Sequence, residues 1–281
     1  MNEVELKAAL GREERRSEAI SPDMAQRYLD TLADGPVLAP PAELMGIQWC
    51  LAPATVPIAE TGPDGHPRKG GFLPAVLLPR RMWAGGSLTF LDDFRVGDAV
   101  ERVSKVADIR MKEGRTGALC FVTVEHSYRT ERGVAVQERQ DIVYREAATE
   151  AAPLSGEPAD ADLPGDVCLD IEASTLLLFR YSALTFNGHR IHYDRDYAMR
   201  KEFYPGLVVH GPLQATFAMR LAASLGSGQR PTRFSFRGVA PMVDGGKFRV
   251  RARRTAADTV ALSVIAADGR LTTTAEMKWE G

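Results

Sequence analysis

Three of the five histidines in the chain, His189, His192 and His210, fall within residues 179–210. Imidazole exchanges a proton near neutral pH, so acid–base chemistry is one interpretation of this cluster. A metal site with a carboxylate such as Asp194 is a second, although the HxxH spacing differs from the i, i+4 spacing that places two histidines on one helix face. A third makes them loop histidines that only satisfy hydrogen bonds. The histidine pattern alone leaves all three open.

The residues that follow His210 predict an apolar helix and then antiparallel strands. From Gly211 to Leu225, leucine and phenylalanine recur at four-residue spacing, with a proline in the first turn. Small residues around the whole circumference indicate a helix embedded against a sheet. Three segments with alternating polarity then predict half-buried strands, which begin near Phe248, Val260 and Leu271.

The N-terminal part repeats this order more loosely. We expect a short apolar helix over residues 40–52, and the strands expected after it cover residues 83–90, 119–128 and 134–144. Before Gly35 lies an additional segment, in which Ser21 and Pro22 predict the start of a helix.

Residues 147–166 are rich in alanine, proline, glycine and acidic residues, which predicts a linker between two units. A helix followed by a strongly bent antiparallel sheet, occurring twice, predicts an α+β double hotdog, in which each sheet wraps around a central helix. We therefore expect an N-terminal hotdog unit over residues 1–146, which carries the N-terminal helical extension, and a C-terminal unit over residues 167–281.

The composition is that of an ordinary globular protein. The 281 residues include 35 Lys+Arg and 37 Asp+Glu, and the net charge of -2 provides no long-range attraction to nucleic acid or to an anionic membrane. The three cysteines lie far apart, which fits neither a disulfide framework nor a zinc cluster. No apolar run approaches the roughly 18 residues of a membrane span, and residues 1–19 lack the apolar core of a signal peptide. We expect a cytoplasmic protein whose partner is a small molecule, without nucleic-acid or membrane partners.

Two segments resemble a known hydratase family. Residues 180–194 (RYSALTFNGHRIHYD) and 204–211 (YPGLVVHG) look like the hydratase region of MaoC-like enzymes. More narrowly, they resemble the subgroup with fused hotdogs, which includes mesaconyl-C4-CoA hydratase, itaconyl-CoA hydratase and 3-hydroxyacyl-thioester dehydratases. The resemblance continues more weakly elsewhere, including residues 77–86 (LLPRRMWAGG). It implies a hydro-lyase that acts on acyl-CoA thioesters and has its catalytic motif in the C-terminal unit.

The chain departs from the general motif of the family, which reads serine or threonine, glycine, aspartate, any residue, asparagine, proline, an aliphatic residue and histidine. Aligned on the last position, His192 keeps the histidine, whereas Asn187 stands in place of aspartate. His189 and Arg190 replace the asparagine and the proline. An amide cannot take a proton from water at neutral pH, although it can hold that water. The fused subgroup is similar in carrying asparagine here, so the resemblance implies a variant of the site.

Hydration of a 2-enoyl thioester needs a base for the water, an acid for the α-carbon and donors for the charge on the thioester oxygen. The resemblance implies that His192 is the base, which also returns the proton, and that Asn187 fixes the water. A backbone N–H at a helix start suits the developing oxyanion, which points to Gly211. We expect no cofactor, because CoA is part of the substrate, and no metal ion, because hydration does not need one.

Guanidinium groups suit carboxylates and phosphates, so nearby arginines are candidates for substrate binding. The expected substrate-binding residues are Arg180, Arg190, His189, Arg81, Trp83 and Tyr181. By resemblance, the non-catalytic N-terminal unit forms the wall around the acyl group, with room for a branched or dicarboxylic chain near Trp83 and Trp49. We expect His66 to be exposed in a loop that could close as a lid, and His126 only to pack.

The resemblance favours itaconyl-CoA or mesaconyl-CoA as the substrate, hydrated to citramalyl-CoA, as in itaconate degradation. Dehydration of straight-chain 3-hydroxyacyl thioesters, which uses the same machinery in reverse, stays open. A non-catalytic acyl-thioester binding module and a thioesterase also stay open. A monomer is feasible because one double hotdog contains both units, and exposed sheet edges make a homodimer equally compatible.

Overall fold

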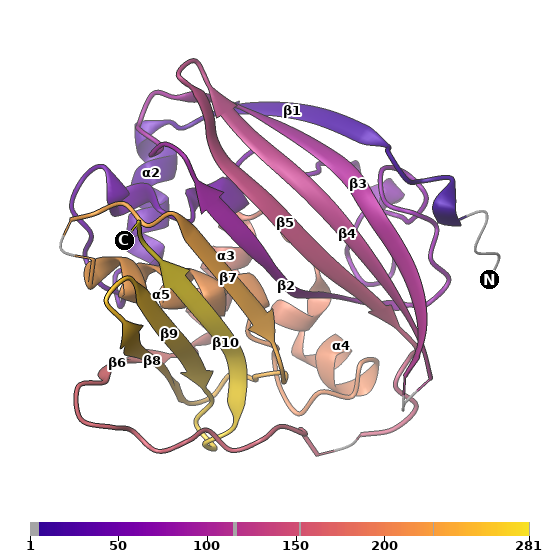
Figure 1. The fold of residues 1–281 in the computed structure, drawn as a ribbon. Coiled ribbons are helices and arrows are strands. Elements are labelled where there is room, and N and C mark those ends of the chain that lie inside the picture. Colours follow the sequence, from indigo (N-terminus) through magenta and orange to yellow (C-terminus); the bar gives the residue numbers. More distant parts are fainter. Residues whose placement is uncertain (1–5, 115–116, 152, 227, 281) are drawn as a thin grey trace.

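The computed structural model describes residues 6–114, 117–151, 153–226 and 228–280. One antiparallel sheet runs through it in the order β1-β3-β4-β5-β2-β7-β10-β9-β8-β6 (Figure 1). The N-terminal strands are β1 (Glu13–Ala19), β2 (Arg80–Phe90), β3 (Ala99–Gly114), β4 (Gly117–Thr130) and β5 (Gly133–Arg145). The C-terminal strands are β6 (Val167–Glu172), β7 (Arg233–Gly238), β8 (Lys247–Ala256), β9 (Thr259–Ile265) and β10 (Leu271–Lys278). The two halves join where β2 pairs with β7.

The C-terminal half has the expected architecture. Helix α5 (Gly211–Ser224) is buried over most of its length and packs against β8, β9 and β10. Leu213, Phe217 and Leu221 contribute to the core between the helix and the sheet. The alanines between them let the sheet approach closely on several sides, which explains why this helix carries so few large residues. The α+β double-hotdog expectation is confirmed in this bent sheet and its embedded helix.

The expected helix over residues 40–52 is wrong. The segment forms two 3-10 turns, η1 (Ala42–Leu44) and η2 (Ile47–Cys50), interrupted by Gly46 at φ 97°. A Cβ at Gly46 would lie 2.5 Å from Tyr28 Oη, so glycine is required for the close approach. Tyr28 belongs to α2 (Pro22–Thr31) and donates a hydrogen bond of 2.6 Å to the Met45 carbonyl. The N-terminal addition is therefore part of the fold, and its strand β1 forms the sheet edge beside β3.

The interior of the N-terminal half is divided. One apolar cluster includes Tyr128 and Val136, and a second includes Val124 and Ile142. Between these clusters, β4 and β5 place polar side chains on the inner face, namely His126, Glu138 and Gln140. A hotdog unit that lacks its central helix thus keeps a polar band where apolar core would be expected.

The linker is bound to the C-terminal sheet. Asp160, Asp162 and Asp166 pair with three arginines of β8, which are Arg249, Arg251 and Arg253. Arg251 is only 2% exposed, and its guanidinium donates a 3.1 Å hydrogen bond to Asp162 Oδ1. The arginines that alternate with apolar residues in β8 therefore lie on the polar face of the strand, where they bind the segment that connects the two halves.

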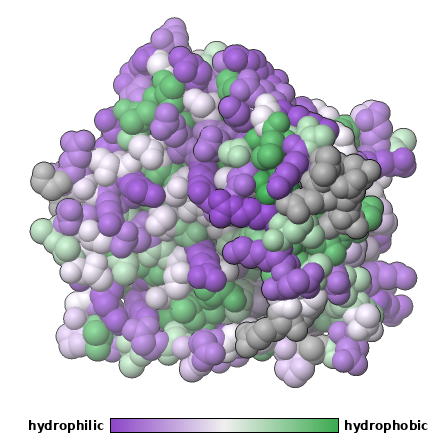
Figure 2. Space-filling model, turned by 45° about the vertical axis from the view of Figure 1, so that its right-hand side comes forward, coloured by the Kyte–Doolittle hydropathy of each residue, from purple (hydrophilic) through white to green (hydrophobic). Residues whose placement is uncertain are grey.

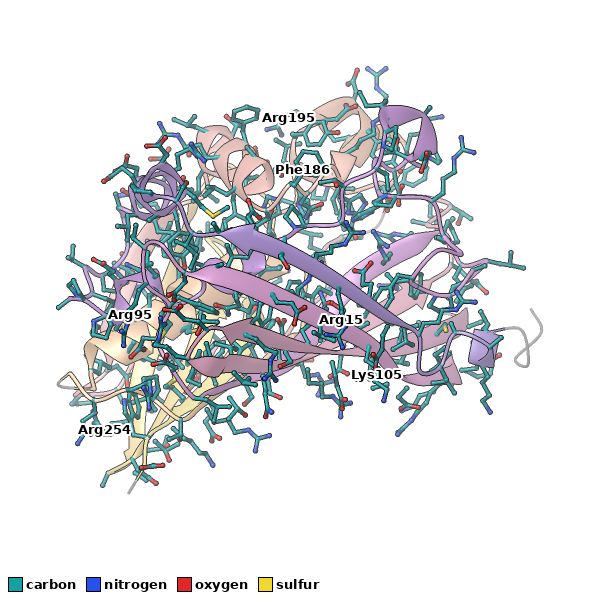
Figure 3. The ribbon with its side chains drawn as sticks, turned by 90° about the horizontal axis from the view of Figure 1, so that it is seen from above. Arg15, Arg95, Lys105, Phe186, Arg195 and Arg254 are labelled. Atoms are coloured by element: carbon teal, nitrogen blue, oxygen red, sulfur yellow. The ribbon has the colours of Figure 1, made fainter. Side chains whose placement is uncertain are left out.

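The remaining elements are η3 (Ile58–Glu60), α3 (Thr175–Leu184), η4 (Arg190–His192) and α4 (Arg195–Arg200). Figure 3 places Phe186 and Arg195 beside these last helices, with Arg15 and Lys105 at the strands β1 and β3. On the face seen in Figure 2, hydrophilic side chains surround small hydrophobic areas. Within the described ranges, no helix is both long enough and apolar enough to cross a bilayer.

Candidate active site

A cavity of about 1590 Å³ lies between the two halves. The C-terminal half contributes Asn187, His192 and Gly211 to its wall, and the N-terminal half contributes Arg81 and Trp83. Two further lining residues, Phe179 and Phe186, are 61% and 60% exposed, which marks a mouth beside α3. The cavity thus requires both units, although the expected catalytic residues come from one.

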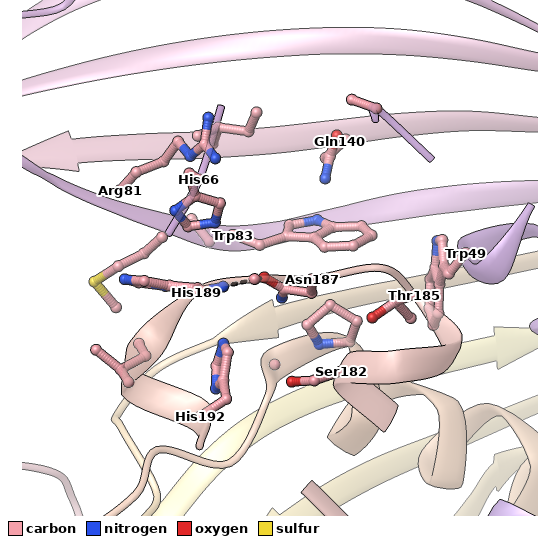
Figure 4. Close-up of a pocket in the computed structure, with 18 of the residues that line it drawn as sticks. Trp49, His66, Arg81, Trp83, Gln140, Ser182, Thr185, Asn187, His189 and His192 are labelled. Carbon is pink, nitrogen blue, oxygen red and sulfur yellow. Dashed lines mark hydrogen bonds between the residues drawn. The ribbon is translucent and has the colours of Figure 1, made fainter. Parts of the chain in front are cut away.

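The motif loop begins where α3 ends. Phe186 has φ 49°, a left-handed conformation that turns the chain sharply, and the Asn187 N–H donates a 2.8 Å hydrogen bond to the Ser182 carbonyl. The Asn187 Oδ1 accepts the His189 N–H at 3.0 Å (Figure 4). No described residue accepts a hydrogen bond from Asn187 Nδ2, so this group is available to donate to a ligand in the cavity, and Oδ1 keeps a second lone pair.

His192 ends the turn η4 and is only 7% exposed. Its Nδ1 lies 2.7 Å from the Val208 carbonyl, an acceptor that fixes the proton on Nδ1 and leaves the Nε2 lone pair free. Burial lowers the pKa of His192 to about 4, so the imidazole is neutral at pH 7. These two features give a general base of fixed orientation that contacts the cavity.

His210 is a buried neighbour of His192. Its ring stacks on that of His192, with centroids 3.6 Å apart and planes 18° apart. His210 Nε2 is hydrogen bonded to Ser182 Oγ at 2.8 Å, and the residue is fully buried. Burial and the nearby His192 hold its pKa well below the usual range. Sequence reasoning gave His210 no role, although its place in the histidine cluster was a signal.

Gly211 is the first residue of α5 and lines the cavity. Its N–H has no acceptor within the helix, and the next residue is proline, which has no N–H. A Cβ at Gly211 would lie 3.7 Å from the Trp83 carbonyl oxygen, its nearest neighbour among the described atoms. The missing side chain therefore leaves free space in front of a single backbone donor.

The expectation that His66 is exposed is wrong. Its imidazole is 17% exposed, lines the cavity and lies 4.3 Å from the His189 ring, measured between centroids. His66 Nδ1 donates to Asp64 Oδ2 at 3.1 Å, and the His66 N–H donates to Asp64 Oδ1 at 3.1 Å. Burial and the charge of Arg81 lower the pKa of His66 to about 4. The loop around it is therefore packed into the site.

A glycine pair holds this loop against the motif loop. A Cβ at Gly65 would lie 1.9 Å from the Gly188 carbonyl oxygen, so no larger residue fits. Arg190 completes the contact, because its N–H donates to the Asp64 carbonyl at 2.9 Å and its Nη1 donates to the Pro63 carbonyl at 3.0 Å. Two loops more than a hundred positions apart in sequence thus form one wall.

Arg190 and Arg180, two of the expected substrate-binding residues, do not line the cavity. The Arg190 guanidinium is paired with Asp194 at 2.7 Å and lies over the Tyr197 ring, outside the cavity wall. Arg180 lies on the exposed face of α3, because the opposite face of that helix supplies the buried residues. Both arginines are therefore close to the motif in sequence, but neither contributes to the cavity wall.

The other expected substrate-binding residues all line the cavity. Arg81 has no carboxylate within 4.0 Å among the described residues, and Figure 4 shows it beside His66. Trp83 lies edge-on to Trp49 with centroids 5.4 Å apart. Tyr181 is 1% exposed, and its hydroxyl lies 3.3 Å from Thr216 Oγ1. His189 is 6% exposed, and burial together with the charges of its neighbours lowers its pKa.

Within the part of the chain that the structure describes, Asp64, His66 and His189 form a group that could hold a metal ion, since one ligand atom of each lies within 4.8 Å of the others. Two of these atoms, His66 Nδ1 and Asp64 Oδ2, are hydrogen bonded to each other. The positive charge of Arg81 acts to lower the pKa values of all three residues, and the same charge would oppose a bound cation.

The polar band was missed by sequence reasoning, and the expectation that His126 only packs is wrong. His126 lines the cavity and is hydrogen bonded to Ser104 at 2.8 Å and Gln140 at 3.1 Å. Glu138 accepts hydrogen bonds of 3.0 Å from the Trp49 indole and from the Tyr128 hydroxyl. Burial raises the pKa of Glu138 to about 7. In the sequence, the only indication of this band was that polar residues occupy inward-facing positions of β4 and β5, whose other inward-facing residues are apolar.

Solved structures share this fold. A MaoC-like dehydratase superimposes with a TM-score of 0.73 at 14% identity, over 98% of this chain and 100% of that chain. A MaoC-like dehydratase from Phytophthora capsici superimposes with a TM-score of 0.69 at 14% identity, over 100% of this chain and 98% of that chain. The molecule is therefore a MaoC-like double hotdog.

Sequence comparison identifies the family. The model of the family "Hydroxyacyl-thioester dehydratase type 2" matches residues 46–244. The chain is 41% identical over 237 residues to the mesaconyl-C(4)-CoA hydratase of Chloroflexus aurantiacus, covering 83% of this chain and 82% of that protein. A shorter match, 41% identical over 68 residues, joins it to the mitochondrial hydroxyacyl-thioester dehydratase type 2 of Schizosaccharomyces pombe, over 24% of this chain and 23% of that protein. The chain belongs to the hydroxyacyl-thioester dehydratase type 2 family and is a hydro-lyase.

Proposed function

We propose that the protein adds water reversibly to a branched C5 dicarboxylic enoyl-CoA, either mesaconyl-C4-CoA or its double-bond isomer itaconyl-CoA, and forms citramalyl-CoA. The observation that carries the reaction type is the convergence of three groups on one cavity. These are the free Nε2 of His192, the amide of Asn187 and the N–H of Gly211. The similarity to a mesaconyl-C(4)-CoA hydratase supports the substrate class.

In this mechanism, His192 Nε2 takes a proton from a water molecule while the water oxygen forms a bond to the β-carbon. The electron pair of the double bond moves toward the thioester, and the N–H of Gly211 stabilises the charge on the carbonyl oxygen. With mesaconyl-C4-CoA, the imidazolium then returns its proton to the α-carbon, so the base is regenerated. With itaconyl-CoA, whose double bond joins the β-carbon to a methylene group, the proton goes to that methylene carbon instead. Asn187 fixes the water, to which its free Nδ2 group can donate a hydrogen bond, while the His189 N–H holds Oδ1 in place.

The polar band in the N-terminal half makes straight-chain fatty acyl groups less suitable as substrates. A long hydrocarbon chain that entered the N-terminal half would lie against His126, Glu138 and Gln140. These groups already have hydrogen-bond partners in the protein, so a hydrocarbon chain would remove only their remaining contact with water, which costs a smaller amount of free energy. A short acyl group that carries its own polar substituent avoids that cost.

The direct test incubates the protein with mesaconyl-, itaconyl- and crotonyl-CoA and follows the enoyl-thioester absorbance and the gain of one water by mass spectrometry. We expect hydration of a dicarboxylic substrate, and a loss of about 10²–10⁴-fold in kcat for His192→Ala. Arg180→Ala, on the exposed face of α3, is the matched control and should keep wild-type activity.

Three results would contradict the proposal. Hydration of crotonyl-CoA alone would favour the fatty-acyl branch, and release of free CoA thiol would favour a thioesterase. Loss of activity on chelation, restored by added metal, would make the Asp64, His66 and His189 group a metal centre. We expect the rate to survive chelation, because no proposed step needs a metal ion.

We further place this reaction in the cytoplasm, as a step in itaconate degradation. The three cysteines are all free thiols, which fits a reducing compartment. The C5 dicarboxylic substrate supports the pathway.

A further inference from the structure

One corner of the cavity contains the guanidinium of Arg81, which has no ion-pair partner among the described residues. Arg81 lines the cavity from β2, and no carboxylate lies within 4.0 Å of it among the described residues. The nearest acidic group that influences it, Asp64, uses both carboxylate oxygens for hydrogen bonds to His66. A half-buried guanidinium with no anionic partner is costly, unless a ligand supplies the anion.

The surroundings of Arg81 are otherwise neutral or positive. Lys69 also lines the cavity and is influenced by the charge of Arg81, and His66 and His189 are uncharged because burial holds their pKa values low. Among the described residues, two carboxylates are close to these imidazoles, and Glu202, 4.0 Å from His189 Nε2, is already paired with Arg80, which leaves Asp64 as the negative group without an arginine partner. The corner is thus short of one negative charge, which is the charge of a single carboxylate.

A row of imidazole rings connects this corner to the proposed base. The ring of His66 lies 4.3 Å from that of His189, and the ring of His189 lies 5.5 Å from that of His192, measured between centroids. The backbone of His189 is hydrogen bonded to Asn187 Oδ1. In mesaconyl-C4-CoA the free carboxylate is bonded to the β-carbon that receives water, so its binding group must lie close to the base.

Trp83 closes the remaining side. In Figure 4 its indole extends between Asn187 and Gln140, and its Nε1 donates a 2.9 Å hydrogen bond to the Gly85 carbonyl. Its polar atom is therefore engaged, and the ring offers a flat apolar wall. A planar enoyl group could lie along this wall, with its carboxylate directed toward Arg81 and its thioester toward Gly211.

We propose that Arg81 binds the free carboxylate of the acyl group and thereby selects dicarboxylic enoyl-CoA thioesters over uncharged ones. This inference rests on the proposed hydratase function. The guanidinium forms a charge-assisted, bidentate pair with the carboxylate. His66 holds the side of the subsite, and Trp83 forms its wall.

The test compares kcat/KM for mesaconyl-CoA and crotonyl-CoA in wild type, Arg81→Met and Arg81→Lys. We expect Arg81→Met to lose about 100-fold on mesaconyl-CoA and to stay within about 3-fold of wild type on crotonyl-CoA. Arg81→Lys should recover part of the loss, because it keeps the charge but not the bidentate geometry. Arg110→Met, an arginine with a 68% exposed side chain, is the matched control and should leave the ratio unchanged.

A binding measurement separates this proposal from the proposed function. Methylsuccinyl-CoA and butyryl-CoA cannot be hydrated, so their dissociation constants do not depend on catalysis. We expect wild type to prefer methylsuccinyl-CoA by about 10-fold or more and Arg81→Met to lose this preference. If wild type hydrates nothing but shows the preference, the subsite stands and the proposed function fails.

The opposite results would overturn the subsite. If Arg81→Met lowers kcat/KM equally for both substrates, Arg81 serves the shared thioester or CoA part. If it lowers neither, or if wild type binds both analogues equally, the acyl carboxylate is not bound there. Should Arg81→Met fail to fold, as judged by circular dichroism, Arg81→Lys and the wild-type analogue comparison decide the question.

Discussion

His192 acts as a base only when its imidazole is neutral, which makes its protonation the first quantity to test. Its pKa is lowered to about 4 by burial, so protonation begins well below neutral pH. The stacked neighbour His210 has a lowered pKa as well, so the pair carries no charge under ordinary conditions.

We therefore expect kcat/KM to be constant from neutral pH down to about pH 5 and to fall below that. A pH–rate profile checks this, with circular dichroism at each pH to exclude unfolding. An acid limb near pH 6.5 would show that the imidazole is not desolvated in the working enzyme.

At the scale of elements, the site depends on the contact between two loops. Residues 62–67 enter the N-terminal half before β2, and the motif loop follows α3. Arg190 joins them through the Pro63 and Asp64 carbonyls and is itself held by Asp194. Arg190 is thus a positioning residue, because it acts through the loops it connects.

Arg190→Ala should lower kcat/KM by about 10-fold on mesaconyl-CoA and crotonyl-CoA alike, since a loosened wall misplaces shared groups. Hydrogen exchange should also increase at residues 62–67, which a purely local loss of charge would not cause. Arg200→Ala removes an exposed i, i+4 pair with Asp196 and is the control. A loss confined to the dicarboxylic substrate would instead indicate direct contact with the carboxylate.

At the scale of the whole molecule, all five histidines of the chain are held neutral. The pKa values of His66, His126 and His192 are each lowered to about 4, and those of His189 and His210 are also lowered. Burial is the largest cause for each of them. In the unfolded chain, histidine has a pKa of about 6.5. Between pH 6.5 and 4 the histidines therefore bind more protons in the unfolded state than in the folded state. Glu138 acts in the opposite direction, because burial raises its pKa to about 7, but it offsets only about one of the five histidines.

Stability should consequently be highest above about pH 6.5 and fall as the pH decreases toward 4. The Asp–Arg pairs of the linker do not contribute in this range, because their carboxylates have lowered pKa values and titrate at more acidic pH. Urea unfolding midpoints at pH 7.5, 6 and 5 check this expectation. A midpoint that does not change over this range would mean that the histidines are solvated in the folded protein.

Local patterns in the sequence were enough to predict the elements whose interactions are short in range. The four-residue repeat fixed α5, and alternation fixed the inner and outer faces of β8 and β9. The predicted helix over 40–52 does not form, because Gly46 adopts a left-handed conformation that interrupts it. The close contact with Tyr28 requires glycine at this position. A pattern of residue types does not include such long-range contacts.

For the site, the sequence by itself was enough to propose His192, Asn187 and Gly211 as the residues of the reaction, because they stand in a recognisable motif. Only the tertiary structure decided how they are used. The free nitrogen of His192 follows from a contact with Val208, and the wall around it follows from the packing of Gly65 on Gly188. These contacts join segments distant in sequence, and hydrogen bonding and burial depend on the atoms that folding brings together.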